Sequence, residues 1–312
     1  KYKRLTKTNV FYDDLLRFQG SVIVFDKNGD DTLWVRTFYN EFEKEEIDNS
    51  LKRIYTLLHS DGDERNLQFL NVDHIDFCTF GNSKPFRIKI RNILNDNYTH
   101  FYIKKADASR IFGLELEDVL SPNRINYLVF KDTLIEEHIV GIPGDVFLEK
   151  HLKNCTESEK AQIAKEFVKF NERCMIGLLG DMRSYNFVVI PIYDYDHIVF
   201  KIRAIDFDQQ CYEGNFKLYK PHLFKENYPF YQLVKDKLKQ NSIEQYQNEE
   251  RSILVKRLVG SEERLKDLLV AMKSMELSPL DKLEQLKNET FKFTLDINFK
   301  KAKSMGEIIE AA

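Results

Sequence analysis

The sequence predicts an α+β fold in two lobes, a strand-rich lobe followed by a mostly helical one. Short runs of β-branched and aromatic residues, separated by turn-forming residues, dominate the chain up to about residue 141. After Pro143-Gly144, apolar residues recur mainly at the three- and four-residue spacing of helices. We therefore place the boundary between the lobes after residue 141.

The first 71 residues predict a hairpin and a helix attached to the first lobe. Runs at 20–26 and 32–39 are apolar and β-branched, and they flank a turn-like Lys-Asn-Gly-Asp sequence. Apolar residues then follow helical spacing over 41–59. This segment is expected either to extend the sheet of the first lobe or to cap it, and the sequence leaves both alternatives open.

The first lobe proper, residues 72–141, is expected to contain three strands, a helix and two further strands. Asn- and Gly-containing turns at 81–83 and 95–97 separate the first three strands. The expected strands are 72–80, 86–93, 99–105, 125–131 and 133–140, and the expected helix is 107–120.

The second lobe, residues 142–312, is expected to be helical except for one hairpin. Its strands are expected at 186–192 and 198–205, with the turn at 193–196. The segment 294–299 is expected to be a short strand or merely extended. The expected helices are 145–153, 157–178 and stretches near 229–239, 246–258, 261–274 and 279–291.

Composition and charge exclude several classes of protein. The 312 residues carry a net charge of −3, which argues against a nucleic-acid binder that relies on bulk charge. The four cysteines form no Cys-x-x-Cys pair, so neither a zinc site nor a disulfide framework is indicated. No apolar run approaches the ~20 residues of a membrane span. We expect a cytoplasmic protein with reduced thiols and with neither a nucleic-acid nor a membrane partner.

Three polar residues of the second lobe are expected to lie together. Asp181 follows the long helix, Asn186 begins the hairpin, and Asp206 ends its returning strand. Because a hairpin brings its two outer ends together, Asn186 and Asp206 are expected to be neighbours. Hard oxygen ligands suit Mg²⁺, which prefers one or two carboxylates together with phosphate and water oxygens. The sequence therefore predicts a magnesium site at the base of the hairpin.

These residues carry a resemblance to a known family. Gly180-Asp181, with Asn186 five residues after the aspartate, resembles the catalytic loop of protein kinases and of their small-molecule relatives, the aminoglycoside and choline phosphotransferases. Ile205-Asp206-Phe207 looks like the metal-binding element of the same family. The order of helix, loop, hairpin and aspartate is more specific than the Asp-x4-Asn spacing alone. The resemblance covers about residues 72–212.

The first lobe adds to this resemblance. Phe101-Tyr102-Ile103-Lys104 looks like the strand that carries the phosphate-binding lysine, and it is the third strand of that lobe. The helix that follows offers Glu115 and Glu117 as ion-pair partners for this lysine. Glu115 lies within the apolar face defined by its neighbours, so we favour it over Glu117.

A hinge strand is also indicated. The sequence Leu134–Gly141 resembles the hinge of the small-molecule kinases, whose backbone hydrogen-bonds adenine. By this resemblance, Glu137 and Ile139 are expected to contact the nucleotide.

The resemblance implies a two-lobed, protein-kinase-like fold and a phosphotransferase that depends on ATP and Mg²⁺. Asp181 would orient or deprotonate an acceptor hydroxyl, and Asn186 and Asp206 would hold the metal ion. Lys104 would bind the α- and β-phosphates, and Arg183 would contact the γ-phosphate because a guanidinium matches phosphate oxygens. The hinge and the catalytic loop favour a small-molecule acceptor.

The chain departs from the family pattern at three points. Leu179 replaces the usual histidine of the catalytic loop, and the loop at 80–85 holds one glycine, so Lys84 would have to supply a charge there. Asp208 replaces a glycine and would bind a second metal ion or face water. These departures keep a pseudokinase, a nucleotide-binding or scaffold module without turnover, as the alternative function. Nucleotidyl transfer on the same fold is a third.

Overall fold

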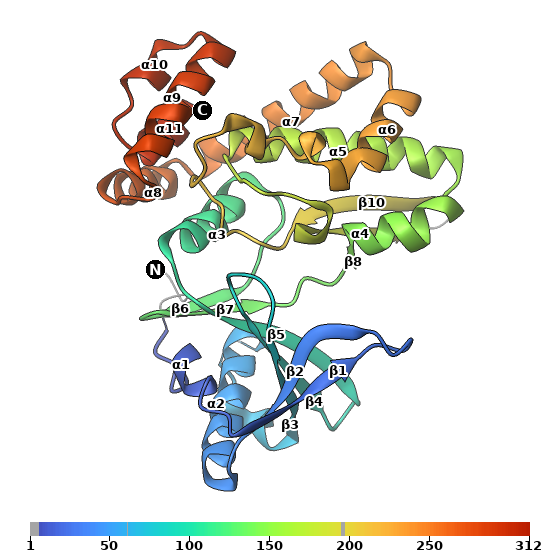
Figure 1. The fold of residues 1–312 in the computed structure, drawn as a ribbon, viewed down its shortest axis with the longest axis vertical. Coiled ribbons are helices and arrows are strands. Elements are labelled where there is room, and N and C mark those ends of the chain that lie inside the picture. Colours follow the sequence, from blue (N-terminus) through green and yellow to red (C-terminus); the bar gives the residue numbers. More distant parts are fainter. Residues whose placement is uncertain (1–5, 61, 195–196) are drawn as a thin grey trace. The chain divides into compact units, whose positions relative to one another are not determined.

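The structure is a computed structural model that describes residues 6–60, 62–194 and 197–312. It has the predicted α+β fold, and the chain divides into two compact units (Figure 1). Unit 1 contains the chain up to Asp107 together with Ile125–His138. Unit 2 contains Ala108–Arg124 and Ile139–Ala312. The helix expected near 107–120 therefore groups with unit 2.

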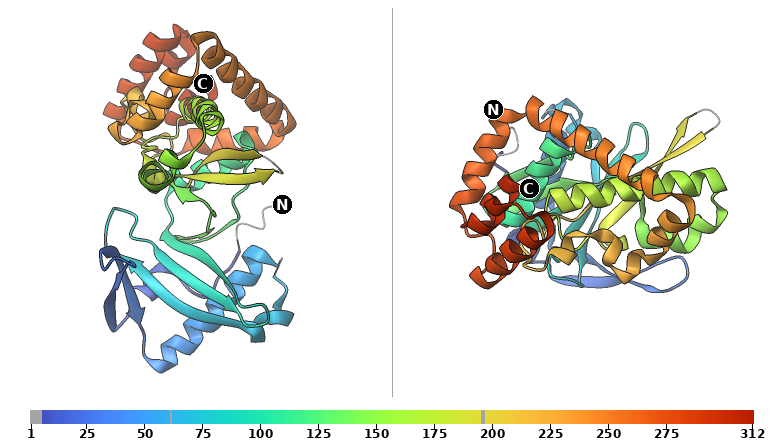
Figure 2. Two further views of the ribbon diagram at one scale, coloured as in Figure 1. Left: turned by 90° about the vertical axis from the view of Figure 1, so that its right-hand side faces the viewer. Right: turned by 90° about the horizontal axis from the view of Figure 1, so that it is seen from above.

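Unit 1 is built on an antiparallel sheet, whose strands run from blue to green in Figure 2. The strand order is β1-β2-β3-β4-β5-β7-β6. The N-terminal hairpin is confirmed, since β1 (Gly20–Phe25) pairs with β2 (Asp31–Phe38). Because β2 also pairs with β3, the N-terminal segment extends the sheet. The other strands are β3 (Leu70–Cys78), β4 (Phe86–Asn92), β5 (Asn97–Lys105), β6 (Tyr127–Phe130) and β7 (Thr133–Glu137).

One face of this sheet is apolar and is covered by helix α2 (Glu41–His59). The helix begins where Asn40 accepts a hydrogen bond from the backbone N–H of Glu43 at 2.8 Å, a typical N-cap contact. Its apolar stripe packs on the sheet because alternate strand residues point to the same face. The core contains Ile47, Leu51, Ile54 and Leu58 of α2 with Phe86, Ile88, Ile90, Phe101 and Ile103 of the sheet. Shorter helical segments are α1 (Tyr12–Leu15) and a 3-10 turn at Glu64–Phe69.

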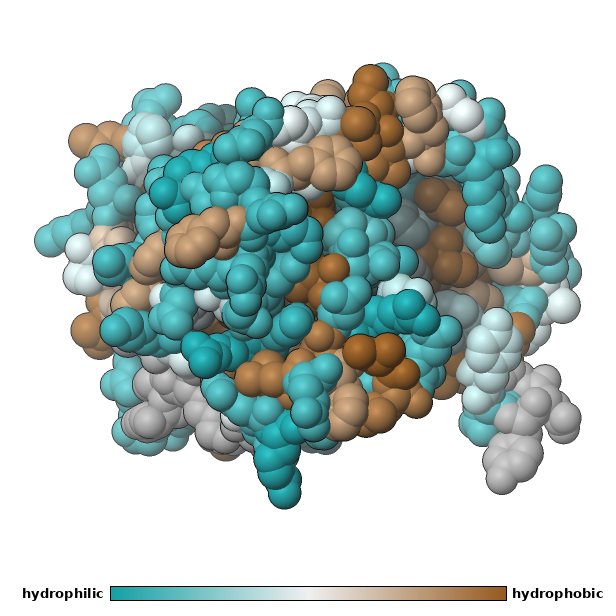
Figure 3. Space-filling model, turned by 90° about the horizontal axis from the view of Figure 1, so that it is seen from below, coloured by the Kyte–Doolittle hydropathy of each residue, from teal (hydrophilic) through white to brown (hydrophobic). Residues whose placement is uncertain are grey.

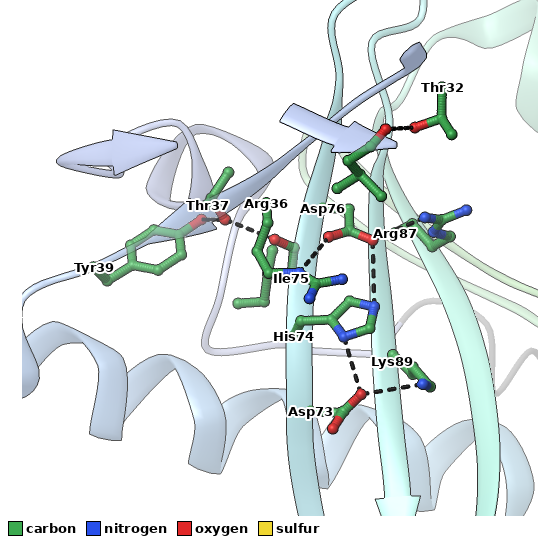
Figure 4. A network of polar contacts seen from close by, with 11 residues as sticks. Thr32, Arg36, Thr37, Tyr39, Asp73, His74, Ile75, Asp76, Arg87 and Lys89 are labelled. Carbon is green, nitrogen blue, oxygen red and sulfur yellow. Dashed lines mark hydrogen bonds and ion pairs between the residues drawn. The ribbon is translucent and has the colours of Figure 1, made fainter. Parts of the chain in front are cut away.

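The opposite face of the sheet carries a polar network centred on Asp76 (Figure 4). The Asp76 side chain is fully buried, and its carboxylate accepts hydrogen bonds from Arg36 at 3.2 Å and Arg87 at 2.8 Å. His74 Nε2 lies 3.3 Å from the same carboxylate. The guanidinium of Arg87 also lies over the ring of Trp34, 4.4 Å from its centroid. Charge pairing therefore compensates for burying this aspartate.

The surface seen from below is mostly hydrophilic, with apolar side chains in small groups (Figure 3). Exposed aromatic residues of unit 1 include Phe42 and Phe80. Scattered apolar side chains of this kind are ordinary for a protein surface and are not by themselves evidence of a binding site. Within the described part of the chain, no helix is both long and apolar enough to cross a membrane.

Unit 2 packs helices around a small sheet in the order β10-β9-β8. The predicted hairpin is confirmed by the pairing of β9 (Phe187–Asp194) with β10 (His197–Ala204). Residues 195–196 of its predicted turn lie outside the described residues. The other elements of this part are β8 (Ile142–Pro143), α3 (Ala108–Leu120), α5 (Glu157–Ile176), α6 (Tyr228–Lys237), α7 (Gln240–Gly260) and a helical segment formed by α4 (Gly144–Val146), a π-helical turn (Phe147–His151) and a 3-10 turn (Leu152–Asn154).

The C-terminal helices correct one expectation. The segment 294–299 is neither a strand nor extended, because it joins two helices. Leu295 adopts a left-handed conformation with φ of 63° and ends the first helix, and Asp296 begins the second by accepting a hydrogen bond from the N–H of Asn298 at 2.9 Å. The helices here are α8 (Glu262–Ser274), α9 (Leu280–Thr294), α10 (Ile297–Lys301) and α11 (Met305–Ala311).

Candidate functional site

The candidate catalytic loop lies in unit 2, between the end of α5 and the start of β9. Two of its non-glycine residues, Leu178 and Asp181, have positive φ angles of 49° and 54°. A left-handed conformation costs an ordinary residue about 1 kcal/mol or more, so the surrounding structure must hold the loop in place. The N–H of Asp181 donates to the carbonyl of Leu218 at 3.1 Å, which fixes this residue from outside the loop.

Hydrogen bonds also connect the loop to the segment that follows Asp206. Leu179 forms a β-bridge with Gln210, and the N–H of Gly180 donates to the carbonyl of Gln209 at 3.2 Å. The side-chain amide of Gln210 donates to the carbonyl of Leu178 at 3.2 Å. Leu179, which stands where the family has histidine, is itself buried. Backbone and amide contacts thus order the loop without an imidazole.

The hairpin brings Asn186 and Asp206 next to each other, as expected. Phe187 pairs with Ala204, and the N–H of Ile205 donates to the carbonyl of Asn186 at 3.0 Å. The side-chain amide of Asn186 in turn donates to the backbone carbonyl of Asp181 at 2.8 Å. Asn186 is therefore linked to Asp181 and to Ile205, the residue that precedes Asp206, at the base of the hairpin.

The chemistry of these side chains fits a magnesium ion bound with a phosphate-bearing substrate. The amide nitrogen of Asn186 donates to the backbone carbonyl of Asp181, which turns the nitrogen toward the loop and leaves the amide oxygen as the atom that could ligate a metal ion. Among the described residues, no three His, Cys, Asp or Glu side chains gather as a metal site. An amide oxygen and one carboxylate suit Mg²⁺, which commonly takes its remaining ligands from phosphates and water.

Arg183 contacts protein carboxylates on two sides. Its Nε donates to Asp181 Oδ1 at 2.7 Å, and its Nη1 lies 2.8 Å from Glu226 Oε1. The hydrogen bond with Asp181 is the largest effect raising the pKa of Arg183 above its usual value. Glu226 was not among the predicted site residues, because it lies 43 residues further along the chain and no local pattern links it to Arg183. The predicted contact between Arg183 and a γ-phosphate stays a prediction.

Asp208 lies near a cation of helix α3. Its carboxylate is 3.8 Å from Arg110, which partly neutralises it. The same helix approaches the segment after Asp206 closely, because Gly113 leaves no room for a side chain against Phe207. Glu115, the favoured partner of Lys104, pairs with Arg264 of α8 at 2.5 Å.

Lys104 lies in unit 1, on β5, and is 7% exposed. Its ammonium is 2.8 Å from Glu136 on the neighbouring strand β7. Glu136 was not among the predicted site residues. It could have been considered, because it precedes Glu137 on a strand that pairs with the strand of Lys104, and side chains on paired strands can form ion pairs. Lys104 and Glu115 belong to different units, so their pairing stays a prediction.

The predicted nucleotide-binding strand and loop have defined local structures. The Glu137 carboxylate accepts hydrogen bonds from the backbone and side-chain N–H groups of Asn126, at 2.8 and 3.0 Å. In the loop between β3 and β4, Gly81 and Lys84 have positive φ angles, and Tyr12 donates to the carbonyl of Lys84 at 2.8 Å. Contacts of this loop, of Glu137 and of Ile139 with a nucleotide stay predictions.

Comparison with known proteins identifies no relative. No model of a known protein family matches the chain, and no curated protein matches it. The function therefore has to be inferred from the residues and their geometry.

Proposed function

We propose that this protein is an ATP- and Mg²⁺-dependent phosphotransferase with a protein-kinase-like, two-lobed fold. The observation that carries the proposal is that Asn186 contacts both Asp181 and Ile205, the residue that precedes Asp206, at the base of a hairpin that follows a long helix. Their order along the chain and the types of their side chains are those of the catalytic loop and metal-binding element of the family.

The architecture of unit 1 supports the same proposal. Lys104 is the residue before the end of β5, which follows β3 and β4 in the antiparallel sheet, and the chain then forms α3, which belongs to unit 2, and two further strands of unit 1. The last of these strands, β7, pairs beside the lysine strand. This order of three strands, helix and two strands is the one that the sequence resemblance implies.

Each of these residues would have its own role in phosphoryl transfer. The Asp181 carboxylate would orient the acceptor hydroxyl and take up its proton, while the Asn186 oxygen and the Asp206 carboxylate would hold the cation. Bound Mg²⁺ would neutralise charge on the phosphate oxygens. The Lys104 ammonium would bind the α- and β-phosphates. The acceptor proposed is a small molecule that carries a hydroxyl group.

A pseudokinase is the second candidate, and a specific observation favours it. The Asp181 carboxylate is already engaged by Arg183, and the family histidine is replaced by the buried Leu179. A loop held in this way is compatible with nucleotide binding without turnover.

A thermal-shift assay with Mg²⁺ and ATP or GTP tests nucleotide binding. A ligand at 100 times its Kd stabilises the folded protein by about 2.7 kcal/mol, which raises the melting temperature. We expect this shift in the wild-type protein and its loss in Asp206→Ala. Asp236→Ala, which removes an exposed acid of α6 in the same unit, is the matched control and should keep the shift. Absence of any shift in the wild-type protein would contradict nucleotide binding.

Turnover separates the enzyme from the pseudokinase. We expect Asp181→Ala to keep the Mg-ATP shift and to lose ATP turnover by about 10²- to 10⁴-fold, because general-base assistance contributes on that scale. Nucleotide binding without turnover in the wild-type protein would favour the pseudokinase. Mass spectrometry of the product distinguishes transfer of a phosphate from transfer of a nucleotide.

A further inference from the structure

The best-defined cluster of charges beside the candidate catalytic loop links Asp181, Arg183 and Glu226. Arg183 Nε donates to Asp181 Oδ1 at 2.7 Å, and Arg183 Nη1 donates to Glu226 Oε1 at 2.8 Å. One guanidinium is thus shared by two carboxylates that lie far apart in the sequence. The planar, five-donor guanidinium suits such a bridge, whereas a lysine ammonium offers no rigid fork.

The segment that carries Glu226 is itself held rigidly against the loop. The ring of Phe224 lies under the Arg183 guanidinium, 4.9 Å from ring centroid to carbon. Asn227 is fully buried, and its side-chain amide donates to the carbonyls of Met182 and Pro221, both at 2.8 Å. Contacts on either side of Glu226 therefore fix its position relative to Arg183.

The hydrogen bonds of Asp181 distinguish its two carboxylate oxygens. Oδ1 accepts the short hydrogen bond from Arg183, whereas Oδ2 lies 3.5 Å from the amide nitrogen of Asn186, at the limit of a hydrogen bond. Oδ2 is therefore the oxygen better able to accept a proton from an acceptor hydroxyl. The position of Arg183 therefore determines which oxygen of Asp181 can face an acceptor hydroxyl.

We propose that Glu226 is a positioning residue, which holds Arg183 against Asp181 so that Oδ2 of the catalytic carboxylate faces the acceptor. This inference rests on the proposed phosphotransferase function. Phe224 supports the same guanidinium from its flat side. Glu226 acts through Arg183 and does not itself touch the reacting atoms.

An ordinary partly exposed ion pair gives a different expectation. The side chains of Arg183 and Glu226 are 31% and 25% exposed, and a pair of this kind contributes little to stability. If the pair were only structural, its loss would lower the melting temperature slightly and leave the rate of the chemical step unchanged.

Steady-state kinetics of Mg-ATP turnover distinguish the two cases. In Glu226→Ala we expect kcat to fall about tenfold or more, because misplaced catalytic groups lose rate steeply, while KM for ATP stays within about twofold. Glu226→Gln keeps the length and one acceptor oxygen but loses the charge, so it should retain an intermediate kcat. This graded order is a response that loss of stability alone would not produce.

The matched control is Glu213→Ala. Glu213 pairs with Lys282 at 3.1 Å and has side-chain exposure of 24%, close to that of Glu226, but it does not contact Arg183. We expect its kcat to equal that of the wild-type protein. Unfolding curves measured on every variant show whether each one folds. If Glu226→Ala does not fold, the comparison of Glu226→Gln with the wild-type protein tests the proposal.

Two outcomes contradict different statements. An active wild-type protein whose kcat is unchanged in both Glu226 variants would overturn the role of Glu226 alone. A wild-type protein that binds Mg-ATP but shows no turnover would overturn the phosphotransferase proposal, and with it the positioning role of Glu226.

Discussion

At the scale of single residues, the buried acid Asp76 of unit 1 has a strongly lowered pKa. Burial by itself raises the pKa of this carboxyl, but hydrogen bonds from His74 and Arg87 outweigh burial and hold the pKa well below its ordinary value of 3.8. The charged form is therefore the form that the folded sheet stabilises.

We predict that Asp76→Asn lowers the free energy of unfolding by about 2 kcal/mol, because it leaves two arginines without their shared counter-charge. Arg36 and Arg87 keep some contact with water, which limits the loss. The control is Asp96→Asn, which removes an exposed partner of Arg91 and should change stability by less than about 0.5 kcal/mol. Urea unfolding at pH 7 measures both variants, and equal losses would contradict a special role for the buried acid.

The same carboxyl gives unit 1 a defined acid sensitivity. Because the folded pKa of Asp76 is depressed, its contribution is complete above the unfolded pKa of about 3.8 and is lost as pH falls below that value. We expect the wild-type protein to lose more stability than Asp76→Asn when the pH is lowered from 5 to about 3. Parallel pH dependence in the two proteins would show that other groups dominate.

At the scale of elements, the approach of α3 to the segment after Asp206 depends on Gly113. A Cβ atom there would lie 2.8 Å from Phe207 Cβ and 3.1 Å from Gln210 Cβ, so the chain after Asp206 would have to move. We predict that Gly113→Ala lowers stability by about 2 kcal/mol, since overpacking outweighs the gain in helix propensity. It should also weaken the thermal shift with Mg-ATP.

The control for Gly113 is Gly260→Ala, also in a helix. No atom lies within 4 Å of a Cβ placed at Gly260, so this change should be neutral or slightly stabilising. If Gly113→Ala behaves like its control, α3 adapts more readily than the close approach indicates.

A second prediction concerns the end of α9. Leu295 is 78% exposed and left-handed, a conformation that glycine adopts without strain. Leu295→Gly is therefore expected to raise the free energy of unfolding by about 0.5–1 kcal/mol. Leu280→Gly, at a similarly exposed leucine with helical backbone at the start of the same helix, should lower it by a similar amount. Chemical denaturation of both variants checks the opposite signs.

Sequence patterns predicted the elements well wherever the signal was local. Helix α2 occupies the predicted range 41–59, because its cap and its apolar spacing lie within one segment. The hairpin of β1 and β2 follows from alternating runs around a turn. The segment 294–299 was missed because Leu295, which carries no turn signal, ends α9 in the place where glycine is usual.

The candidate site was predictable only in part, for the same physical reason. The joining of Asn186 and the Asp206 segment follows from hairpin geometry and needs no distant contact. The ion pairs of Lys104 and Arg183 do not follow from hairpin geometry. Their partners, Glu136 and Glu226, lie 32 and 43 positions further along the chain and come close only when the chain folds. A single sequence gives the types of candidate residues but not these pairings.

At the scale of the whole molecule, two hydrophobic cores of the described residues each lie within one unit. The core of unit 1 joins α2 to the sheet, and the core of unit 2 joins α3 to the C-terminal helices. Each core therefore buries its own apolar surface, which is the main favourable contribution to folding. Two-state unfolding of the whole chain is not expected of a protein organised in this way.

We predict two unfolding transitions in differential scanning calorimetry, one for each unit. Asp76→Asn should lower only the transition of unit 1, and Gly113→Ala only that of unit 2, because distant substitutions without shared partners act independently. Mg-ATP should raise the transition of unit 2 if Asn186 and Asp206 hold the cation, and Asp206→Ala should abolish this rise. A single transition that every variant shifts equally would show instead that the two units unfold cooperatively.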